Sequence, residues 1–288
     1  MNSAGRTLTG LLKRPVEVPA DAAPPPSPAW NAGQPGVLAI AGALGAQSGL
    51  AIVMSALDRH AEILCGGPGA SRKDLDSVRW IASAALLRRA ADIDALRCAA
   101  PGLRLLCVVR DGRDAVVHRA REMMQTRQYG DLPGAAVEDL ENARAFHLRK
   151  AGRPCTMLGD ESLRRLMGEW VRYIGAVERA RDIMGNDCRV VRLEDLAGVG
   201  DELGRVLRWL DVGDRDAAGA DARAYLEHAL DVPHTGWEAE KPGAFSGSHD
   251  RACVGMWRAV MTEDNKSLVK SMAGELLIEL GYEQGTAW

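Results

Sequence analysis

Apolar residues in this chain come in short continuous runs separated by amphipathic stretches, and this alternation predicts strands and helices in turn. The runs at residues 37–43, 105–109 and 189–193 have the length and continuity of strands buried on both faces of a parallel sheet. Residues 80–87 form another apolar run, which fits either a strand or a buried helix.

Helical spacing of apolar residues fills most of the intervals between these runs. It predicts helices at residues 50–58, 92–99, 114–128, 166–184, 201–210 and 264–280, with Asp92 as the cap of the second helix. Strands that alternate with helices favour a three-layer α/β/α domain, in which helices cover both faces of a central parallel sheet.

The chain divides into a leader and one domain. Residues 1–35 are rich in proline and alanine and lack a sustained period, so we expect a disordered leader, and residues 36–288 carry the predicted elements. Two polar stretches inside the domain, residues 130–165 and 232–251, contain no predicted strand. We expect these stretches to shape a substrate pocket.

Composition narrows the choice of partner and compartment. The formal net charge of −3 gives no general affinity for nucleic acid or acidic membranes, so an anion site has to be local. Six cysteines are scattered without CxxC or metal-finger spacing, as is usual for reduced thiols in a cytoplasmic protein. No apolar run reaches the ~18 residues of a membrane span. We therefore expect a soluble cytoplasmic protein with a small-molecule partner.

The predicted strand at residues 105–109 is followed at once by a charged segment. The next five residues read RDGRD, from Arg110 to Asp114. Ligands of open α/β sheets bind at the carboxyl ends of the strands, and two arginines beside a helix start suit a phosphate. The alternative is a strand-to-helix turn with a surface ion-pair cluster, and these residues alone do not decide between the two.

Several other chemistries are excluded because the sequence motifs that they require are absent. The glycine-rich segment LGAQSG at residues 44–49 lies between a predicted strand and a helix, but it lacks the lysine of a GxxxxGK[ST] loop. Neither a GxGxxG fingerprint nor a GxSxG nucleophile elbow occurs there, and no histidine pair has metal-ligand spacing.

Three separated segments together resemble one family. VVRDGRDAVVH, VVRLEDL at residues 190–196 and VGMWR at residues 254–258, together with Trp170 and the closing LGYE, are similar to the sulfotransferases that use 3′-phosphoadenosine 5′-phosphosulfate (PAPS). The resemblance extends from about residue 37 to residue 282 and implies the P-loop-like sulfotransferase fold.

The resemblance assigns roles around the cofactor's 3′-phosphate. Arg110 and Asp114 match the family's central motif, and His118 stands where the family has a serine. By resemblance, Arg110 holds the 3′-phosphate and position 118 completes that site, since a histidine can still donate a hydrogen bond. The alternative for His118 is a solvent-exposed helical histidine.

The family's phosphosulfate loop is matched less well. Gln47, Ser48, Gly49 and Leu50 align with that loop, but the basic residue has become Gln47, and the two hydroxyl positions have become Leu50 and Ala51. A 5′-phosphosulfate would lose a positive charge and two hydroxyl donors here, while the backbone N–H groups at the helix start remain.

Two further elements match in part. Glu194 and Asp195 resemble an acidic pair that orients structure near the cofactor, although surface charges after a strand explain each carboxylate equally well. Arg251 and Gly255 resemble the carboxy-terminal element that approaches the 3′-phosphate, where Asp250 and Ala252 replace two of the family's residues.

The resemblance implies transfer of a sulfuryl group from PAPS to a hydroxyl of a small-molecule acceptor, without a metal. No residue is identified as the base: His60 falls where the family has a structural histidine, and His147 lies in the polar stretch. The altered residues Gln47, Leu50, Ala51 and His118 keep an alternative open. In it the fold has lost or repurposed the cofactor site and serves as a binding or scaffold subunit, or in different chemistry.

Overall fold

The computed structural model describes residues 35–43, 49–65, 77–85, 87, 90–125, 159–196, 201–213, 217–230, 254–285 and 287–288. The predicted leader, apart from Pro35, and most of both polar stretches lie outside these residues. No helix within the described ranges is long and apolar enough to cross a membrane.

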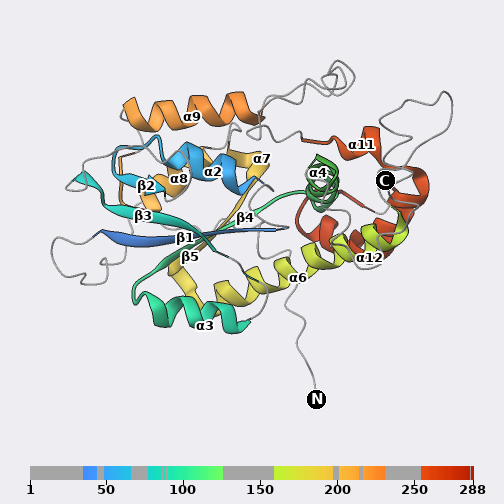
Figure 1. Ribbon diagram of the computed structural model, residues 1–288, viewed down its shortest axis with the longest axis horizontal. Coiled ribbons are helices and arrows are strands. Elements are labelled where there is room, and N and C mark those ends of the chain that lie inside the picture. The colour runs from blue at the N-terminus through green and yellow to red at the C-terminus, as the bar shows by residue number, and fades with distance from the viewer. Residues whose placement is uncertain are drawn as a thin grey trace.

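A five-stranded parallel sheet forms the centre of the described part (Figure 1). Its strands are β1 Gly36–Gly42, β2 Ile63–Cys65, β3 Trp80–Ala85, β4 Arg104–Val109 and β5 Cys188–Arg192. Their order across the sheet is β2-β3-β1-β4-β5, and every neighbouring pair is parallel. The ambiguous run at residues 80–87 is therefore a strand over most of its length.

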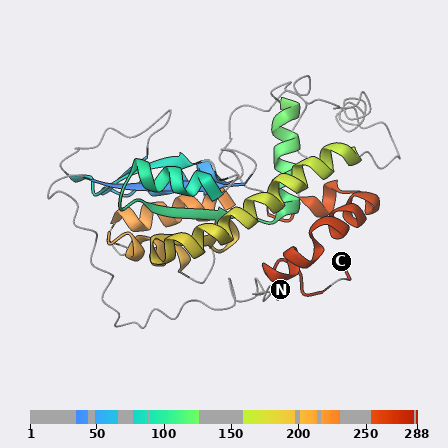
Figure 2. The ribbon, with the colours of Figure 1, turned by 90° about the horizontal axis from the view of Figure 1, so that it is seen from below.

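Helices cover the sheet in two layers (Figures 1 and 2). One layer holds α2, α7, α8 and α9, and the other holds α3 and α6. The helices α4, α11 and α12 lie beyond the end of the sheet, and their buried side chains share one core cluster with those of α6. The bounds are α2 Leu50–Leu57, α3 Ala90–Ala99, α4 Gly112–Gln125, α6 Asp160–Met184, α7 Leu193–Leu196, α8 Glu202–Trp209, α9 Ala217–Leu230, α11 Trp257–Val260 and α12 Glu263–Glu279.

The alternation of side chains along β4 explains the two layers. Leu105, Cys107 and Val109 are buried among the side chains of α3, α4 and α6, whereas Leu106 and Val108 are buried among those of α2, α8 and α9. A strand with apolar residues on both faces needs cover on both sides. The three-layer α/β/α fold predicted from the sequence is thereby confirmed.

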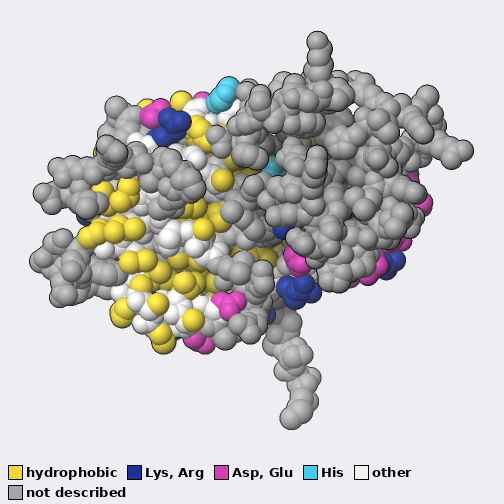
Figure 3. Space-filling view, viewed as in Figure 1, with side chains coloured by type: hydrophobic (Ala, Val, Ile, Leu, Met, Phe, Trp, Pro, Cys, Tyr) yellow, Lys and Arg dark blue, Asp and Glu magenta, His cyan; other side chains and the backbone are white. Residues whose placement is uncertain are grey.

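The strand β3 is less completely covered. In Figure 3, hydrophobic side chains reach the surface over the left of the view, where β1 and β3 lie in Figure 1, and Ile81 of β3 is 39% exposed. A single exposed isoleucine is ordinary for a monomeric surface.

The strand order places a topological switch point between β1 and β4. From β1 the chain passes through α2 to β2 on one side of the sheet, and from β4 it passes through α4 and α6 to β5 on the other. Such a reversal opens a crevice at the carboxyl ends of the two central strands. The turns that follow β1 and β4 are the two that carry the predicted phosphate motifs.

Several predicted boundaries are wrong. Helix α3 begins at Ala90, so Asp92 lies in its first turn and is not its cap. Helix α4 begins at Gly112, two residues before the predicted start, and α6 begins at Asp160, inside the stretch predicted as loop. Leu193, predicted to end β5, begins α7. Helices α9 and α11 were not predicted.

Candidate functional site

Arg110 lies at the carboxyl end of β4 and is 1% exposed. Helix α6 fixes its backbone, because Trp170 Nε1 donates a hydrogen bond of 3.1 Å to the Arg110 carbonyl oxygen. A Cβ atom at Gly112 would lie 2.7 Å from the Trp170 ring, so the start of α4 passes close over this indole. Arg110 is therefore held at the switch point, as the motif predicts.

Arg113 has a different environment although it belongs to the same motif. Its side chain is fully buried, and the guanidinium makes two bonds to Asp111, from Nε to Oδ1 at 3.0 Å and from Nη2 to Oδ2 at 2.7 Å. Its Nη1 donates to Glu283. Since these carboxylates occupy Nε, Nη1 and Nη2, the prediction of two phosphate-facing arginines is wrong for Arg113.

Two tryptophans complete the surroundings of Arg113. Its guanidinium carbon lies 3.8 Å from the centroid of the Trp257 ring and 4.6 Å from that of Trp288. The two rings meet edge to face, with centroids 6.0 Å apart. The ion-pair alternative is thus correct for Arg113, except that the cluster is buried. Glu283 and Trp288 lie far away in the sequence, and no motif indicated this contact.

Asp114 connects the start of α4 to the carboxy-terminal segment. It is fully buried and accepts hydrogen bonds from two backbone N–H groups, Gly255 at 2.5 Å and Trp257 at 3.0 Å. Burial raises the pKa of Asp114, while the charge of Arg110 and these two bonds act in the opposite direction. The carboxylate thus places the turn around Gly255 beside the end of β4.

Glu194 ties α7 to the same turn. Its Oε1 accepts from the Asp111 backbone N–H at 3.0 Å, and its Oε2 accepts from the Tyr282 hydroxyl at 3.2 Å. Burial raises the pKa of Glu194, and Arg110 again opposes the shift. Glu194 therefore holds α7, the turn after β4 and Tyr282 together, and its predicted role near a cofactor stays a prediction. Asp195 is 53% exposed and lies 3.5 Å from Arg192, which is the surface-charge alternative.

The turn after β1 presents backbone instead of charge. Gly49 has φ +95°, and it precedes α2 without a side-chain cap. The first bond of the helix runs from Val53 N to Gly49 O at 3.0 Å, so the N–H groups of residues 50–52 precede the regular ladder. Leu50 is 4% exposed. Gln47 and Ser48 lie outside the described residues.

Tyr173 of α6 lies beneath both turns. Its buried hydroxyl is 2.9 Å from the carbonyl oxygen of Ala41 in β1 and 3.0 Å from that of Val108 in β4. One hydroxyl within reach of both strands fixes the distance between them near the switch point. Burial raises the pKa of Tyr173 well above its usual value, so the hydroxyl stays protonated and can donate.

His60 and His118, two histidines among the described residues, have different surroundings. His60 is fully buried, with Nε2 2.7 Å from the Gly213 carbonyl oxygen and Nδ1 3.3 Å from the Glu62 N–H, which agrees with the structural role expected for it. His118 is half-buried on α4, so the alternative of a solvent-exposed histidine is wrong. Its predicted contact with a phosphate stays a prediction. Arg251 and His147 lie outside the described residues.

The charges around the end of β4 do not by themselves attract an anion. Two arginines, Arg110 and Arg113, lie among four carboxylates, those of Asp111, Asp114, Glu194 and Glu283. A phosphate placed here needs further positive charge or N–H donors. Among the described residues, no group of three or more His, Cys, Asp or Glu side chains is arranged to hold a metal ion.

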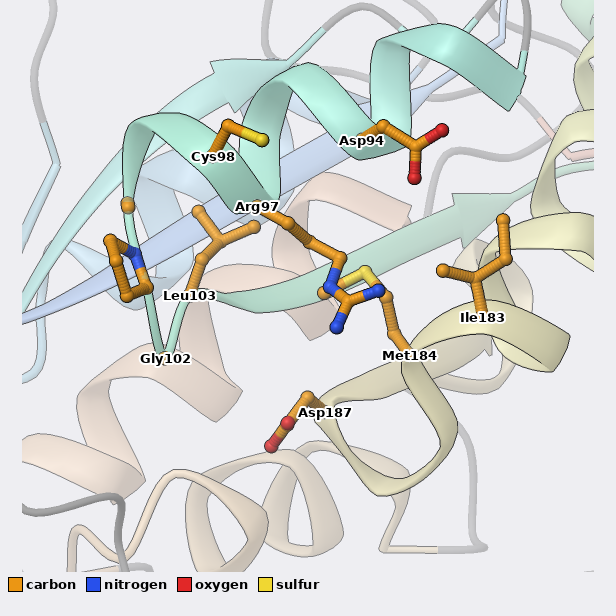
Figure 4. A pocket seen from close by; sticks show the side chains of 10 residues that line it. Asp94, Arg97, Cys98, Gly102, Leu103, Ile183, Met184 and Asp187 are labelled. Atoms are coloured by element: carbon orange, nitrogen blue, oxygen red, sulfur yellow. The ribbon is translucent and has the colours of Figure 1, made fainter.

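A separate pocket lies at the opposite end of the sheet (Figure 4). It is bordered by the end of α3, the turn before β4 and the end of α6, and Arg97, Asp94, Cys98 and Asp187 supply its polar side chains. These residues precede β4 and β5, whereas Arg110 and Leu193 follow them. The pocket is therefore distinct from the switch-point crevice.

Among known proteins, the chain is similar to solved structures of sulfotransferases. No family model and no curated protein matches the chain. A sulfotransferase from Alicyclobacillus acidocaldarius is similar with 14% identity and a TM-score of 0.47, over 86% of this chain and 95% of that one.

Two further similar structures contain a nucleotide. A mouse sulfotransferase complexed with PAP has 11% identity and a TM-score of 0.46, over 83% of this chain and 84% of that one. A retinol dehydratase in complex with androsterone and the inactive cofactor PAP has 12% identity and a TM-score of 0.39, over 85% and 81%. At these identities the likeness concerns the fold alone.

Proposed function

We propose that the chain is a sulfotransferase that moves a sulfuryl group from PAPS to a hydroxyl of a small-molecule acceptor. The observation that carries the proposal is the place of Arg110. It lies buried at the carboxyl end of β4, beside β1 at the switch point, with the Gly255 turn held against the same strand end by Asp114. Nucleotides bind at such switch points in open α/β sheets.

The residues at the crevice fit the two ends of such a nucleotide unequally. Arg110 supplies a guanidinium for the 3′-phosphate, with His118 and Arg251 as its proposed companions. For the 5′ end, the proposed contacts are the N–H groups at the start of α2 and the residues Gln47 and Ser48. The N–H of Gly255 is already bonded to Asp114, so this glycine contributes close backbone approach.

PAPS would supply the sulfuryl group and leave as adenosine 3′,5′-bisphosphate. The part of the chain is to hold the nucleotide, place the acceptor hydroxyl in line and receive its proton. Asp114 and Glu194 are poor candidates for the base, because each already accepts two hydrogen bonds within the fold. His60 is bonded at both ring nitrogens. The proposal assigns no base among these residues.

Calorimetric titration with adenosine 3′,5′-bisphosphate tests the proposal. We expect saturable binding and an increase in Tm, since a ligand of the native state stabilises it. Arg110→Ala should weaken binding at least about tenfold, because a charge-assisted hydrogen bond contributes about 1.5–3 kcal/mol. Arg110→Lys keeps the charge and should lose less. Arg164→Ala is the control, since that side chain is 57% exposed on α6. Unchanged affinity in Arg110→Ala would remove this residue from the site.

Gln47→Lys tests the other end of the nucleotide. A restored positive charge should tighten binding of adenosine 3′,5′-bisphosphate by about tenfold if this loop holds the 5′-phosphate, and Gln47→Met, which adds no charge, should not. Indifference to the lysine would favour different chemistry at this end.

A second candidate function is a repurposed fold that binds a partner or another ligand without transferring sulfate. The four carboxylates around Arg110 and Arg113 favour it, since they oppose an anion. Absence of both heat and thermal shift with adenosine 3′,5′-bisphosphate would select this candidate over the transferase.

A further inference from the structure

We propose that Asp114 is a positioning residue for nucleotide selectivity: it holds the turn Val254–Met256 beside Arg110, and thereby sets the preference for a nucleotide with a 3′-phosphate. This inference rests on the proposed function. It assigns to Asp114 no contact with the nucleotide.

The first argument is the number and direction of its bonds. Both carboxylate oxygens accept from the same short segment, Oδ2 from the Gly255 N–H and Oδ1 from the Trp257 N–H. A carboxylate that accepts through both oxygens fixes the orientation of a turn as well as its distance. Gly255 has φ +76°, a conformation that a glycine adopts without strain. The turn can therefore direct the N–H groups of Gly255 and Trp257 at the same carboxylate.

The second argument is the place of Asp114 between the two parts of the predicted site. It lies four residues after Arg110, in the first turn of α4, where burial raises the pKa of its carboxyl and the charge of Arg110 opposes that shift. On its other side lies the turn Val254–Met256, which follows the predicted cofactor residue Arg251 in the sequence. Asp114 thus holds the turn Val254–Met256 against the start of α4 by hydrogen bonds, while Arg113 bonds to Glu283 further along the segment.

The third argument is that the neighbouring contact does something else. Arg113 also touches the carboxy-terminal segment, but through the faces of the Trp257 and Trp288 rings and through Glu283. Stacking and ion pairing hold the side chains of this segment against α4. They do not bind the backbone N–H groups of Gly255 and Trp257, which donate to Asp114. The two functions of α4's first turn, docking and orienting, are therefore carried by adjacent residues.

The test compares the full-length protein and its variants in titrations with adenosine 3′,5′-bisphosphate and adenosine 5′-monophosphate, which lacks the 3′-phosphate. Asp114→Asn replaces one acceptor oxygen by an NH₂ donor, so one of the two N–H groups loses its partner and the turn shifts. The ratio of the two affinities should fall by about tenfold, chiefly through weaker binding of the bisphosphate. Asp114→Glu keeps both oxygens and should give an intermediate ratio.

The matched control is Thr262→Ala in the same carboxy-terminal segment. Thr262 caps α12 by accepting from the Asn265 N–H, so Thr262→Ala destabilises this helix and leaves both hydrogen bonds of Asp114 in place. This variant should keep the wild-type ratio. A purely structural role for Asp114 would change stability and leave the ratio where it was.

The outcomes separate the inference from the proposed function. If the wild-type protein binds neither nucleotide, the proposed function fails. If it prefers the bisphosphate and Asp114→Asn keeps that preference, the inference is overturned while the function stands. Circular dichroism identifies a variant that does not fold, and if Asp114→Asn is one, the ratio measured with Asp114→Glu decides: a wild-type value overturns the inference.

Discussion

The turns that follow β1 and β4 both lie at the switch point, but the β4 turn is rich in charged side chains and the described part of the β1 turn has none. The β4 turn is crowded with charge: Arg110 is 1% exposed, and the side chain of Arg113 is sealed between carboxylates and indole rings. The described part of the β1 turn has a left-handed glycine, a buried leucine and the bare start of a helix.

The difference shows that buried charges and backbone N–H groups are satisfied in different ways. Charge placed on a strand end is costly to bury and must be neutralised within the fold, so the β4 turn contains its own carboxylates. Backbone N–H groups carry no such cost, because water or a ligand can satisfy them equally well. Removing a charge from the β4 turn should therefore cost more stability than changing Gly49 at the end of the β1 turn.

The largest effect should come from Arg113→Ala. It removes one partner from a buried cluster and leaves Asp111 and Glu283 without their cation, which costs about 3–5 kcal/mol. Urea unfolding measures the loss. Arg164→Ala, in an exposed pair on α6, should lose less than about 1 kcal/mol. Equal losses in the two variants would mean that the buried cluster around Arg113 contributes no more stability than an exposed ion pair does.

Gly49→Ala should have an intermediate effect and tests the other turn. The new Cβ would lie 2.3 Å from Leu193 Cδ2, and φ +95° is strained for alanine, so we expect a loss of about 2 kcal/mol in urea unfolding. Gly175→Ala, inside α6 with only the end of Arg179 nearby, should instead gain about 0.5–1 kcal/mol. A stable Gly49→Ala protein would show that this turn is not fixed by its glycine.

The smallest effect should be the pH dependence of Glu194→Gln. Burial raises the pKa of Glu194, so the native state holds its proton to higher pH than the unfolded state does. The stability that this adds is complete below the unfolded pKa and is lost as the pH rises through the folded pKa. Relative to wild type, the glutamine variant should therefore gain stability as the pH rises from about 4 to about 7. An unchanged or opposite trend in urea midpoints would contradict the shift.

The sequence predicts three of the five strands because these carry the signal locally, whereas it leaves β3 ambiguous and misses the three-residue β2. Continuous apolar runs place β1, β4 and β5 within one or two residues, and helical spacing finds α2, α6, α8 and α12. Helix α9 was missed although Ala222, Leu226 and Ala229 are buried at helical spacing, because alanines give a weak hydrophobic period.

The site was predicted only in outline. The motif identifies Arg110 and Asp114, since strand end and helix start are local features. That Arg113 is sealed by Glu283 and Trp288 depends on contacts about 170 residues apart, from Arg113 Nη1 to Glu283, which no spacing rule contains. Glu194 is undecided by the sequence for the same reason, because its two partners, the Asp111 backbone and Tyr282, lie in distant segments.

The cluster around Arg113 also bears on the order in which the protein is made. Residues 111–114 leave the ribosome well before residues 254–288, which supply Gly255, Trp257, Glu283 and Trp288. Until then the arginine and its aspartates have only one another, and the strand end they follow has no carboxy-terminal neighbour. Because such long-range contacts form late, a nascent chain can assemble β1 to β5 while the charged turn after β4 still lacks these partners. The surroundings of Arg113 are thus completed only after residues 254–288 have been made.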